Sequence, residues 1–251
     1  MTAEAVIAAL SLPASTRVDQ RVPKKLLLEN GAPTAADKRL INEGIETIQW
    51  LAVLKQATCG VPAFRDDMRE YLEIAILHVT LREQAKEARL IELLHRAVPY
   101  PVLLLVESEH AVSVSLGHKR QALKEAGKVV LDGEPATVVL PSADSAIYAA
   151  FLQALDLSRQ PRASLYALYQ GLLDTAVALQ ASALTGTFTL LDSTERALQR
   201  RQALHTSIAL QGRIASLRSA AAKASQMARQ VEMNLQIRKL EAELKQVMGA
   251  L

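Results

Sequence analysis

Apolar residues in the last quarter of the chain recur in alternating steps of four and three, and no proline interrupts residues 193–251. This spacing keeps one apolar stripe turned toward a partner helix, as in a coiled coil. The pattern therefore predicts one long coiled-coil helix, the arm, over residues 193–251. Its predicted seam consists of Leu210, Ile214, Leu217, Ala221, Ala224, Ala228, Val231 and Leu235.

A second apolar phase starts inside the same segment, so the seam shifts by about two positions near residues 231–235. A stutter in one coiled coil explains this shift, and so do two different surfaces that the arm contacts. The pattern leaves open whether the arm pairs with a second copy, folds back or docks on another protein. The second phase consists of Met233, Ile237, Leu240, Leu244, Val247 and Leu251.

Shorter patterns in the N-terminal half predict a sheet with helices. Residues 45–54 are typical of a buried strand and residues 71–81 of a half-buried one, because both are rich in strand formers. Thr34, followed by Asp37 three residues later, predicts the start of a helix. Residues 82–97 carry apolar residues at helical spacing. The first half of the sheet domain is therefore expected to contain both kinds of element.

Two hairpins are predicted farther along the chain. Residues 102–107 and 111–116 have the composition of strands and are separated by a short polar loop. Residues 128–131 and 136–140 flank the dipeptide Asp132-Gly133, which is favoured in tight hairpin turns. These four strands would complete a sheet with antiparallel content.

After Pro141 the apolar spacing becomes helical, first in residues 142–155 and then in residues 164–184. The predicted fold class is α+β (or α/β), because strands precede helices along the chain. The predicted parts are a mixed sheet domain over residues 1–141, a helical region over 142–192 and the coiled-coil arm over 193–251.

A basic segment leads into the first predicted strand. Pro13 and Pro23 exclude helix interiors, and a pre-ordered extended segment loses less entropy when it lies along a partner. The alternative is that Arg21 and Lys24 pair with acids of their own domain, such as those at positions 66 and 67. The candidate contacts to nucleic acid or a partner are Arg17, Arg21, Lys24 and Lys25, with Lys119 and Arg120 extending the same basic face.

Charge changes the picture of the arm. The chain has a formal net charge of +3, but residues 196–239 contain nine basic residues and one acid, Glu232. Such a one-sided segment suits a phosphate backbone or an acidic protein surface. Alternatively, the arginine stems only cover the apolar stripe and keep the helix in solution. The candidate contacts on the arm are Arg213, Arg218 and Arg229.

Composition limits the class of protein. With 251 residues and 50% hydrophobic content, the chain can bury a substantial core. Its one cysteine, Cys59, cannot form an internal disulfide, which fits a reducing cytoplasm. No apolar run reaches the length of a transmembrane helix. We therefore expect a soluble cytoplasmic protein without membrane contact.

Candidate chemistry is sparse. A restriction-type nuclease would need an acid on one strand and Glu-x-Lys on the next, to hold magnesium beside the scissile phosphate. Neither Glu73 nor Glu107 is followed by that pattern. The five histidines lack metal-ligand spacing, and no glycine-rich phosphate loop is present. The sequence predicts no catalytic residue, no metal ligand and no cofactor.

Several separated segments form an ordered set along the chain. They are Leu-Pro-x-Ser-Thr-x-Val-x-x-Arg-Val-Pro-Lys-Lys from Leu12, Asp37-Lys38, Ile-x-x-Ile-x-Trp-Leu from Ile45, Glu-Ile-Ala-Ile-Leu-His-Val-Thr-Leu from Glu73, Val-Pro-Tyr-Pro-Val-Leu-Leu-Leu from Val98, and Lys119. Together these segments resemble one bacterial family, numbered 4391 among the domains of unknown function. The resemblance covers most of residues 12–251 and implies an accessory protein encoded beside DNA methyltransferases and helicases of restriction or phage-defence type. It implies no catalytic residues.

These observations predict a non-enzymatic accessory or assembly subunit of a bacterial DNA-directed defence or restriction-modification complex. Its expected partner is a methyltransferase or helicase subunit, or a second copy bound through the C-terminal helix, with DNA as a further contact. Two alternatives stay open. One is a metal-dependent nuclease with a degenerate motif, for which Glu73 and Asp67 are the residues to replace. The other is a pure oligomerisation scaffold, which would have no need of a basic arm.

Overall fold

The computed structural model describes residues 2–123, 125, 127–224 and 226–251. Two compact units, Met1–Ala176 and Val177–Leu251, make up the chain. The division falls inside helix α7 (Leu165–Thr185), so it does not coincide with the predicted boundaries at residues 141 and 192. No helix in the described ranges is long and apolar enough to span a bilayer.

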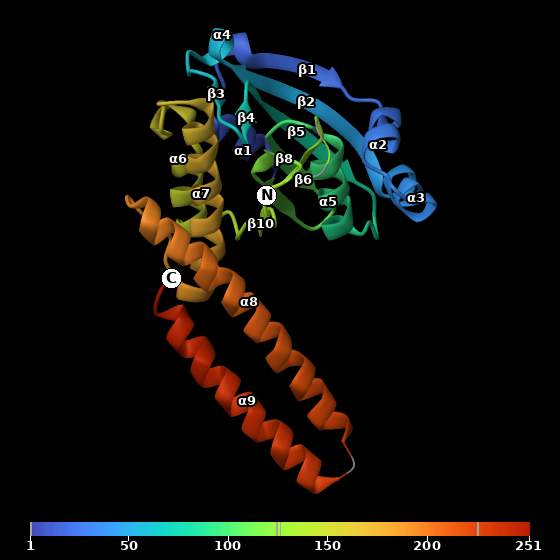
Figure 1. Ribbon diagram of the computed structural model, residues 1–251, viewed down its shortest axis with the longest axis vertical. Helices are drawn as coiled ribbons and strands as arrows, with labels where there is room; N and C mark the ends of the chain where they lie inside the picture. Colours follow the sequence, from blue (N-terminus) through green and yellow to red (C-terminus); the bar gives the residue numbers. More distant parts are fainter. Residues whose placement is uncertain (1, 124, 126, 225) are drawn as a thin grey trace. The chain divides into compact units, whose positions relative to one another are not determined.

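A six-stranded mixed sheet forms the centre of the first unit (Figure 1). The two central strands are parallel to each other, and every other neighbouring pair is antiparallel. This confirms the predicted fold class, a mixed sheet followed by helices. The strands, in spatial order, are β1 (Arg17–Arg21), β2 (Ile45–Lys55), β5 (Glu73–Leu81), β6 (Val102–Glu107), β7 (Val112–Leu116) and β10 (Ala136–Val139).

Helices pack on both faces of this sheet. On one face, alternate residues of β5 and β6, such as Leu77 and Leu104, pack in a core with residues of α2, α3 and α5. On the other face, α1 contacts β6 and α6, and the Tyr169 hydroxyl of α7 donates to the Val102 carbonyl at 2.8 Å. Because both faces are covered, β5 and β6 are apolar almost throughout. The helices are α1 (Ala3–Ala9), α2 (Lys24–Asn30), α3 (Ala35–Gly44), α5 (Glu87–Ala97) and α6 (Ala146–Leu155).

Local signals place several elements where the sequence predicts them. The Thr34 hydroxyl accepts the backbone N–H of Asp37 at 3.1 Å and begins α3. The strand predicted over residues 71–81 begins at Glu73, because Tyr71 belongs to a separate two-stranded sheet. Short elements complete this unit: η1 (Ala14–Thr16), α4 (Gln56–Cys59), β3 (Phe64–Arg65), β4 (Glu70–Tyr71) and η2 (Leu157–Arg159).

The prediction of a hairpin around Asp132-Gly133 is wrong. Strand β9 (Val129–Leu131) pairs with β8 (Lys119–Gln121), whereas β10 pairs with β7. Gly133 does take the left-handed conformation of a turn, with φ +90°. The Asp132 carboxylate, however, binds Arg69 at 2.6 Å and Arg120 at 3.4 Å. The pair with Arg120 joins the end of β9 to β8, and the chain then enters β10 in a different sheet.

The arm is a helical hairpin and not the single helix predicted over residues 193–251 (Figure 1). Helix α8 (Thr194–Lys223) ends at Ala224, whose backbone is extended, and α9 (Met227–Met248) follows. Leu210 and Ile214 of α8 pack against Ile237 and Leu240 of α9. The start of the first apolar phase, in α8, and most of the second phase, in α9, therefore face each other in two antiparallel helices and are buried together.

This arrangement divides the predicted seam. Its first members, Leu210, Ile214 and Leu217, lie in the interface between α8 and α9. The later members do not: Ala224 lies beyond the end of α8, and Ala228, Val231 and Leu235 are exposed. The sequence pattern joined these residues into one stripe because their spacing continues across the turn.

Candidate functional site

The basic residues of the lead-in segment fall into two groups. Arg17 and Arg21 are exposed on β1, which is an edge strand of the sheet. Within the described residues neither forms an ion pair, and neither Arg21 nor Lys24 pairs with Asp66 or Asp67. Lys25 is exposed but pairs with Glu29 at 3.7 Å. Only the two arginines of β1 therefore remain open to a phosphate or an acidic partner.

Lys24 and Lys119 are held by backbone carbonyls and are not part of an exposed basic face. The Lys24 ammonium donates to the Asn42 carbonyl at 3.1 Å and to the Ile45 carbonyl, at the end of α3. Burial, and then repulsion by Arg82 and Arg21, lowers its pKa. Two of the predicted contact residues thus stabilise helix ends, since cations favour the carbonyl end of a helix.

Lys119 is only 3% exposed. Its ammonium donates to the Val98 carbonyl at 3.0 Å and to the His95 carbonyl, so it caps the C-terminus of α5. Burial lowers its pKa to about 8. The neighbouring Arg120 pairs with Asp132 at 3.4 Å. The basic face predicted at positions 119 and 120 is therefore not formed.

A polar chain lies in the core beside Lys119. His95 Nε2 is 2.9 Å from the Ser115 hydroxyl, which is 2.8 Å from the Thr137 hydroxyl. His95 is fully buried, and its Nδ1 has no hydrogen-bond partner among the described atoms. Burial, and then the charge of Lys119, lowers the pKa of His95 to about 3. This imidazole is therefore neutral at physiological pH.

An aromatic cluster surrounds His118, the residue that precedes Lys119. The Tyr71 hydroxyl contacts His118 Nδ1, and His118 Nε2 is 2.8 Å from the Gln170 amide oxygen. The Tyr166 ring stacks on the imidazole with 5.2 Å between ring centroids. Burial raises the pKa of Tyr71 above its ordinary value. His118 is thus part of the packing between α7 and the sheet.

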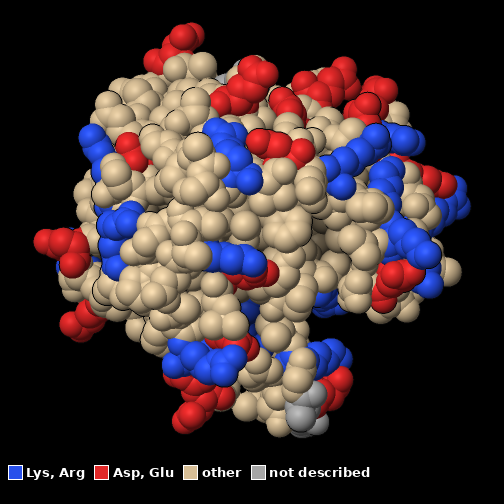
Figure 2. All heavy atoms as spheres, turned by 90° about the horizontal axis from the view of Figure 1, so that it is seen from above, with Lys and Arg blue, Asp and Glu red and all other residues tan. Residues whose placement is uncertain are grey.

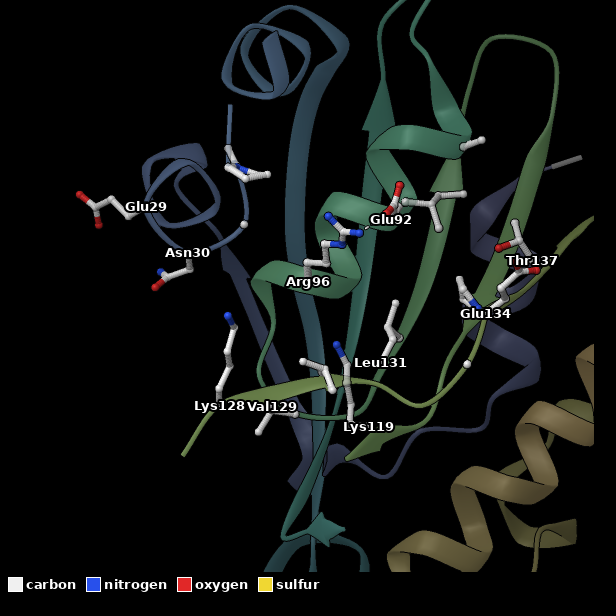
Figure 3. A pocket seen from close by; sticks show the side chains of 18 residues that line it. Glu29, Asn30, Glu92, Arg96, Lys119, Lys128, Val129, Leu131, Glu134 and Thr137 are labelled. Atoms are coloured by element: carbon white, nitrogen blue, oxygen red, sulfur yellow. Dashed lines mark ion pairs between the residues drawn. The ribbon is translucent and has the colours of Figure 1, made fainter. Parts of the chain in front are cut away.

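A cavity of about 1080 Å³ lies beside α5 and the β8–β9 sheet (Figure 3). Lys119 extends from β8 toward Arg96, and a dashed line joins Arg96 to Glu92, which is 2.5 Å away. Lys128 and Glu134 also line the cavity. Acidic and basic side chains thus occur together in this lining, and they define no single class of ligand.

The acids that a nuclease would use lie at different ends of the sheet. Glu73 begins β5 and pairs with Lys55 at 2.7 Å, whereas Glu107 ends β6 with His78 Nε2 at 2.9 Å. Because β5 and β6 are parallel, their first and last residues lie far apart. Asp67 is exposed in a loop. In the described ranges, no group of three His, Cys, Asp or Glu residues could hold a metal ion.

The three candidate basic residues of the arm, Arg213, Arg218 and Arg229, are exposed. Arg218 of α8 binds Glu241 of α9 at 2.6 Å and so joins the two helices. Arg213 and Arg229 form no ion pair in the part of the chain that the structure describes. On the face shown in Figure 2, by comparison, basic side chains lie in separate groups with acidic side chains near most of them. The excess of positive charge belongs to the arm.

Helix α9 carries a second apolar stripe that does not face α8. We call it the outward stripe: Met227, Val231 and Leu235, which are 79%, 53% and 55% exposed. These residues are four apart, so they lie along one side of the helix. Sequence reasoning assigned Val231 and Leu235 to the coiled-coil seam. The signal that could have shown that these two residues lie on another side of the helix is the second apolar phase, which supplies the buried side of α9.

The fold and these surfaces define a three-layer α/β protein that carries a basic helical hairpin. The chain belongs to the family described as Domain of unknown function (DUF4391), whose model matches residues 10–244. No curated protein matches the chain, and no solved structure matches it.

Proposed function

We propose that this protein is a non-enzymatic accessory or assembly subunit that binds a protein partner through its arm. The outward stripe carries this proposal. The inner side of α9 is already buried against α8 through Ile237 and Leu240, yet three large apolar residues remain exposed on another side. Exposed apolar residues at helical spacing are how a helix docks on a partner helix or groove.

The charge around the stripe favours an acidic partner helix. Arg229, Arg238 and Lys239 lie on the same helix. Between residues 195 and 241 the sequence of the arm contains one acid, Glu232. Residues 193–251 contain ten Lys and Arg and four Asp and Glu, and residues 1–192 contain 19 and 22. A second copy of the arm would bring like charges together, which disfavours pairing. The partner is therefore a helix whose apolar stripe is flanked by Asp and Glu.

The setting of this function is a bacterial DNA-directed defence or restriction-modification complex, in which a methyltransferase or helicase subunit is the partner. The family resemblance of the sequence supports that setting. A cytoplasmic location is part of the proposal, because a single half-buried cysteine suits a reducing compartment.

The first test is to purify the tagged chain together with the methyltransferase and helicase subunits proposed as its partners. Replacing Val231 and Leu235 by Asp should remove the bound partner, with an affinity loss of about 100-fold or more, because anchor residues dominate interface energy. The matched control replaces Leu198 and Ile208 of α8, which are also exposed, by Asp. Retention of the partner by the first variant, or its loss in both, contradicts the proposal.

DNA is a second candidate for contact with the arm, because Arg213 and Arg229 are exposed cations in a segment that is nearly free of acids. If they neutralise phosphates, replacing both by Gln should reduce the slope of log affinity against log salt by about two. Duplex binding measured by fluorescence anisotropy at several salt concentrations gives that slope. Arg39→Gln with Lys38→Gln, two exposed cations of α3, is the control. An unchanged slope removes DNA from the proposal.

A further inference from the structure

A small cavity of about 400 Å³ lies in the first unit between β1, α2 and the end of α5. Its floor is apolar and buried, formed by residues such as Ile48, Leu77 and Val98. Leu26 of α2 also lines it and is half exposed. The volume is at the lower end of the range for small-molecule sites, about 300–1,000 Å³. The cavity is thus built for a compact, mainly apolar ligand.

Two aromatic rings line this cavity. The Trp50 and Tyr100 rings are inclined by only 25°, with 6.4 Å between centroids. The Trp50 indole N–H donates to the Ala52 carbonyl at 2.9 Å, so the indole needs no polar partner from a ligand. Both rings are half-buried, and aromatic groups prefer other rings at about 4.5–7 Å between centroids. A planar ring therefore suits the cavity better than an alkyl chain.

Arg21 carries the only charge among the described residues that line this cavity. It is exposed, and no ion pair neutralises it in the described part of the chain. Lys24 lies near enough to Arg21 for the two charges to repel each other. A guanidinium presents a planar fork of N–H donors that matches a carboxylate. The positive charge at the rim of an apolar cavity favours a ligand with one anionic group.

From this juxtaposition of two rings, an apolar floor and one arginine, we infer that the cavity binds a small planar aromatic carboxylate. The ring lies against Trp50 and Tyr100, and the carboxylate binds Arg21. The large cavity beside α5 differs, because it has acids and bases together. This site belongs to the first unit and is independent of the arm and its partner.

The test uses the fact that Trp50 is the only tryptophan of the chain, so its indole N–H gives one cross-peak in a ¹H–¹⁵N spectrum. The full-length protein is titrated with 2-naphthoate, with its neutral isostere 2-naphthamide, and with octanoate. Naphthoate should move the Trp50 peak along a saturable curve. The amide should bind about tenfold more weakly or worse, because a charge-assisted hydrogen bond is lost, and octanoate should leave the peak unmoved.

Variants assign the contact. Arg21→Gln should weaken naphthoate binding to the level of the amide and leave amide binding unchanged. Arg17→Gln, an exposed arginine on the same strand, is the matched control and should bind naphthoate normally. Equal binding of acid and amide, or no movement of the Trp50 peak, overturns the inference. Tighter binding of a peptide that ends in Phe than of naphthoate also overturns it, because the site would then belong to a protein partner.

Discussion

Acidification from pH 6.5 toward pH 3 is expected to lower the free energy of unfolding by up to about 5 kcal/mol through His95 alone. The folded protein holds this imidazole neutral, with a pKa of about 3 instead of 6.5, because it is buried and lies near Lys119. Between these two values the unfolded chain binds a proton that the folded chain does not. Stability is therefore lost as the pH falls, and it is regained as the pH rises through 6.5.

The measurement is urea unfolding at a series of pH values for the wild type and for His95→Gln. Glutamine can keep the contact with the Ser115 hydroxyl but has no proton to gain. The Asp and Glu carboxylates titrate in both proteins, so the difference between the two curves isolates the contribution of His95 to the pH dependence. His110→Gln, which replaces a histidine whose side chain is 87% exposed, should not change the curve. Parallel curves for His95→Gln and the wild type would show that His95 binds its proton equally well in the folded and unfolded states, which contradicts the expected loss.

Leu240→Ala is expected to destabilise the arm by about 2–5 kcal/mol, and Leu235→Ala by less than about 0.5 kcal/mol. The two leucines are five residues apart on the same helix. Leu240 is 8% exposed and packs with Leu210 and Ile214, whereas Leu235 is more than half exposed. Alanine at position 240 leaves a cavity in the helix interface, but at position 235 it removes only exposed surface.

Loss of helical circular dichroism during urea unfolding measures both variants against the wild type. The pair distinguishes the hairpin from the single helix that the sequence pattern predicts. In a continuous coiled coil, Leu235 and Leu240 would both lie in the seam, and the two replacements would have similar costs. A loss for Leu235→Ala as large as the loss for Leu240→Ala would therefore contradict the hairpin.

The elements that sequence could predict are those whose signal is local or whose burial is complete. Thr34 and Asp37 lie within one turn and mark the start of α3 by themselves. Strands β5 and β6 are covered on both faces, so nearly every residue in them is apolar and buried, and the sequence shows a continuous apolar run. The order of strands, helix and strands followed from these patterns, and with it the mixed sheet.

The turn of the arm could not be predicted, because no residue breaks the helical pattern between Lys223 and Met227. What selects two helices is contact between residues more than twenty apart, such as Ile214 with Ile237. Each apolar phase was visible, but the spacing alone does not say whether two phases belong to one helix or to two facing helices.

The environment of the basic residues also depended on distant contacts. Lys119 follows a strand and looks exposed in the sequence, but carbonyls that precede it by 21 and 24 residues bury its ammonium. The cavity beside Trp50 was not predicted at all, since Arg21, Trp50 and Tyr100 come from three separate elements and share no motif. Chemistry assembled from such distances leaves no local pattern to detect.

The central claim, that the outward stripe of α9 binds a partner helix, is tested most directly by the mass in solution from light scattering. The chain is measured alone and then mixed with the purified methyltransferase or helicase subunit that is proposed as its partner. The account predicts the mass of one chain alone, a one-to-one complex in the mixture, and no complex when Val231 and Leu235 are replaced by Asp. A dimer of the chain alone that this double variant abolishes, or a complex that the variant leaves intact, would contradict the account.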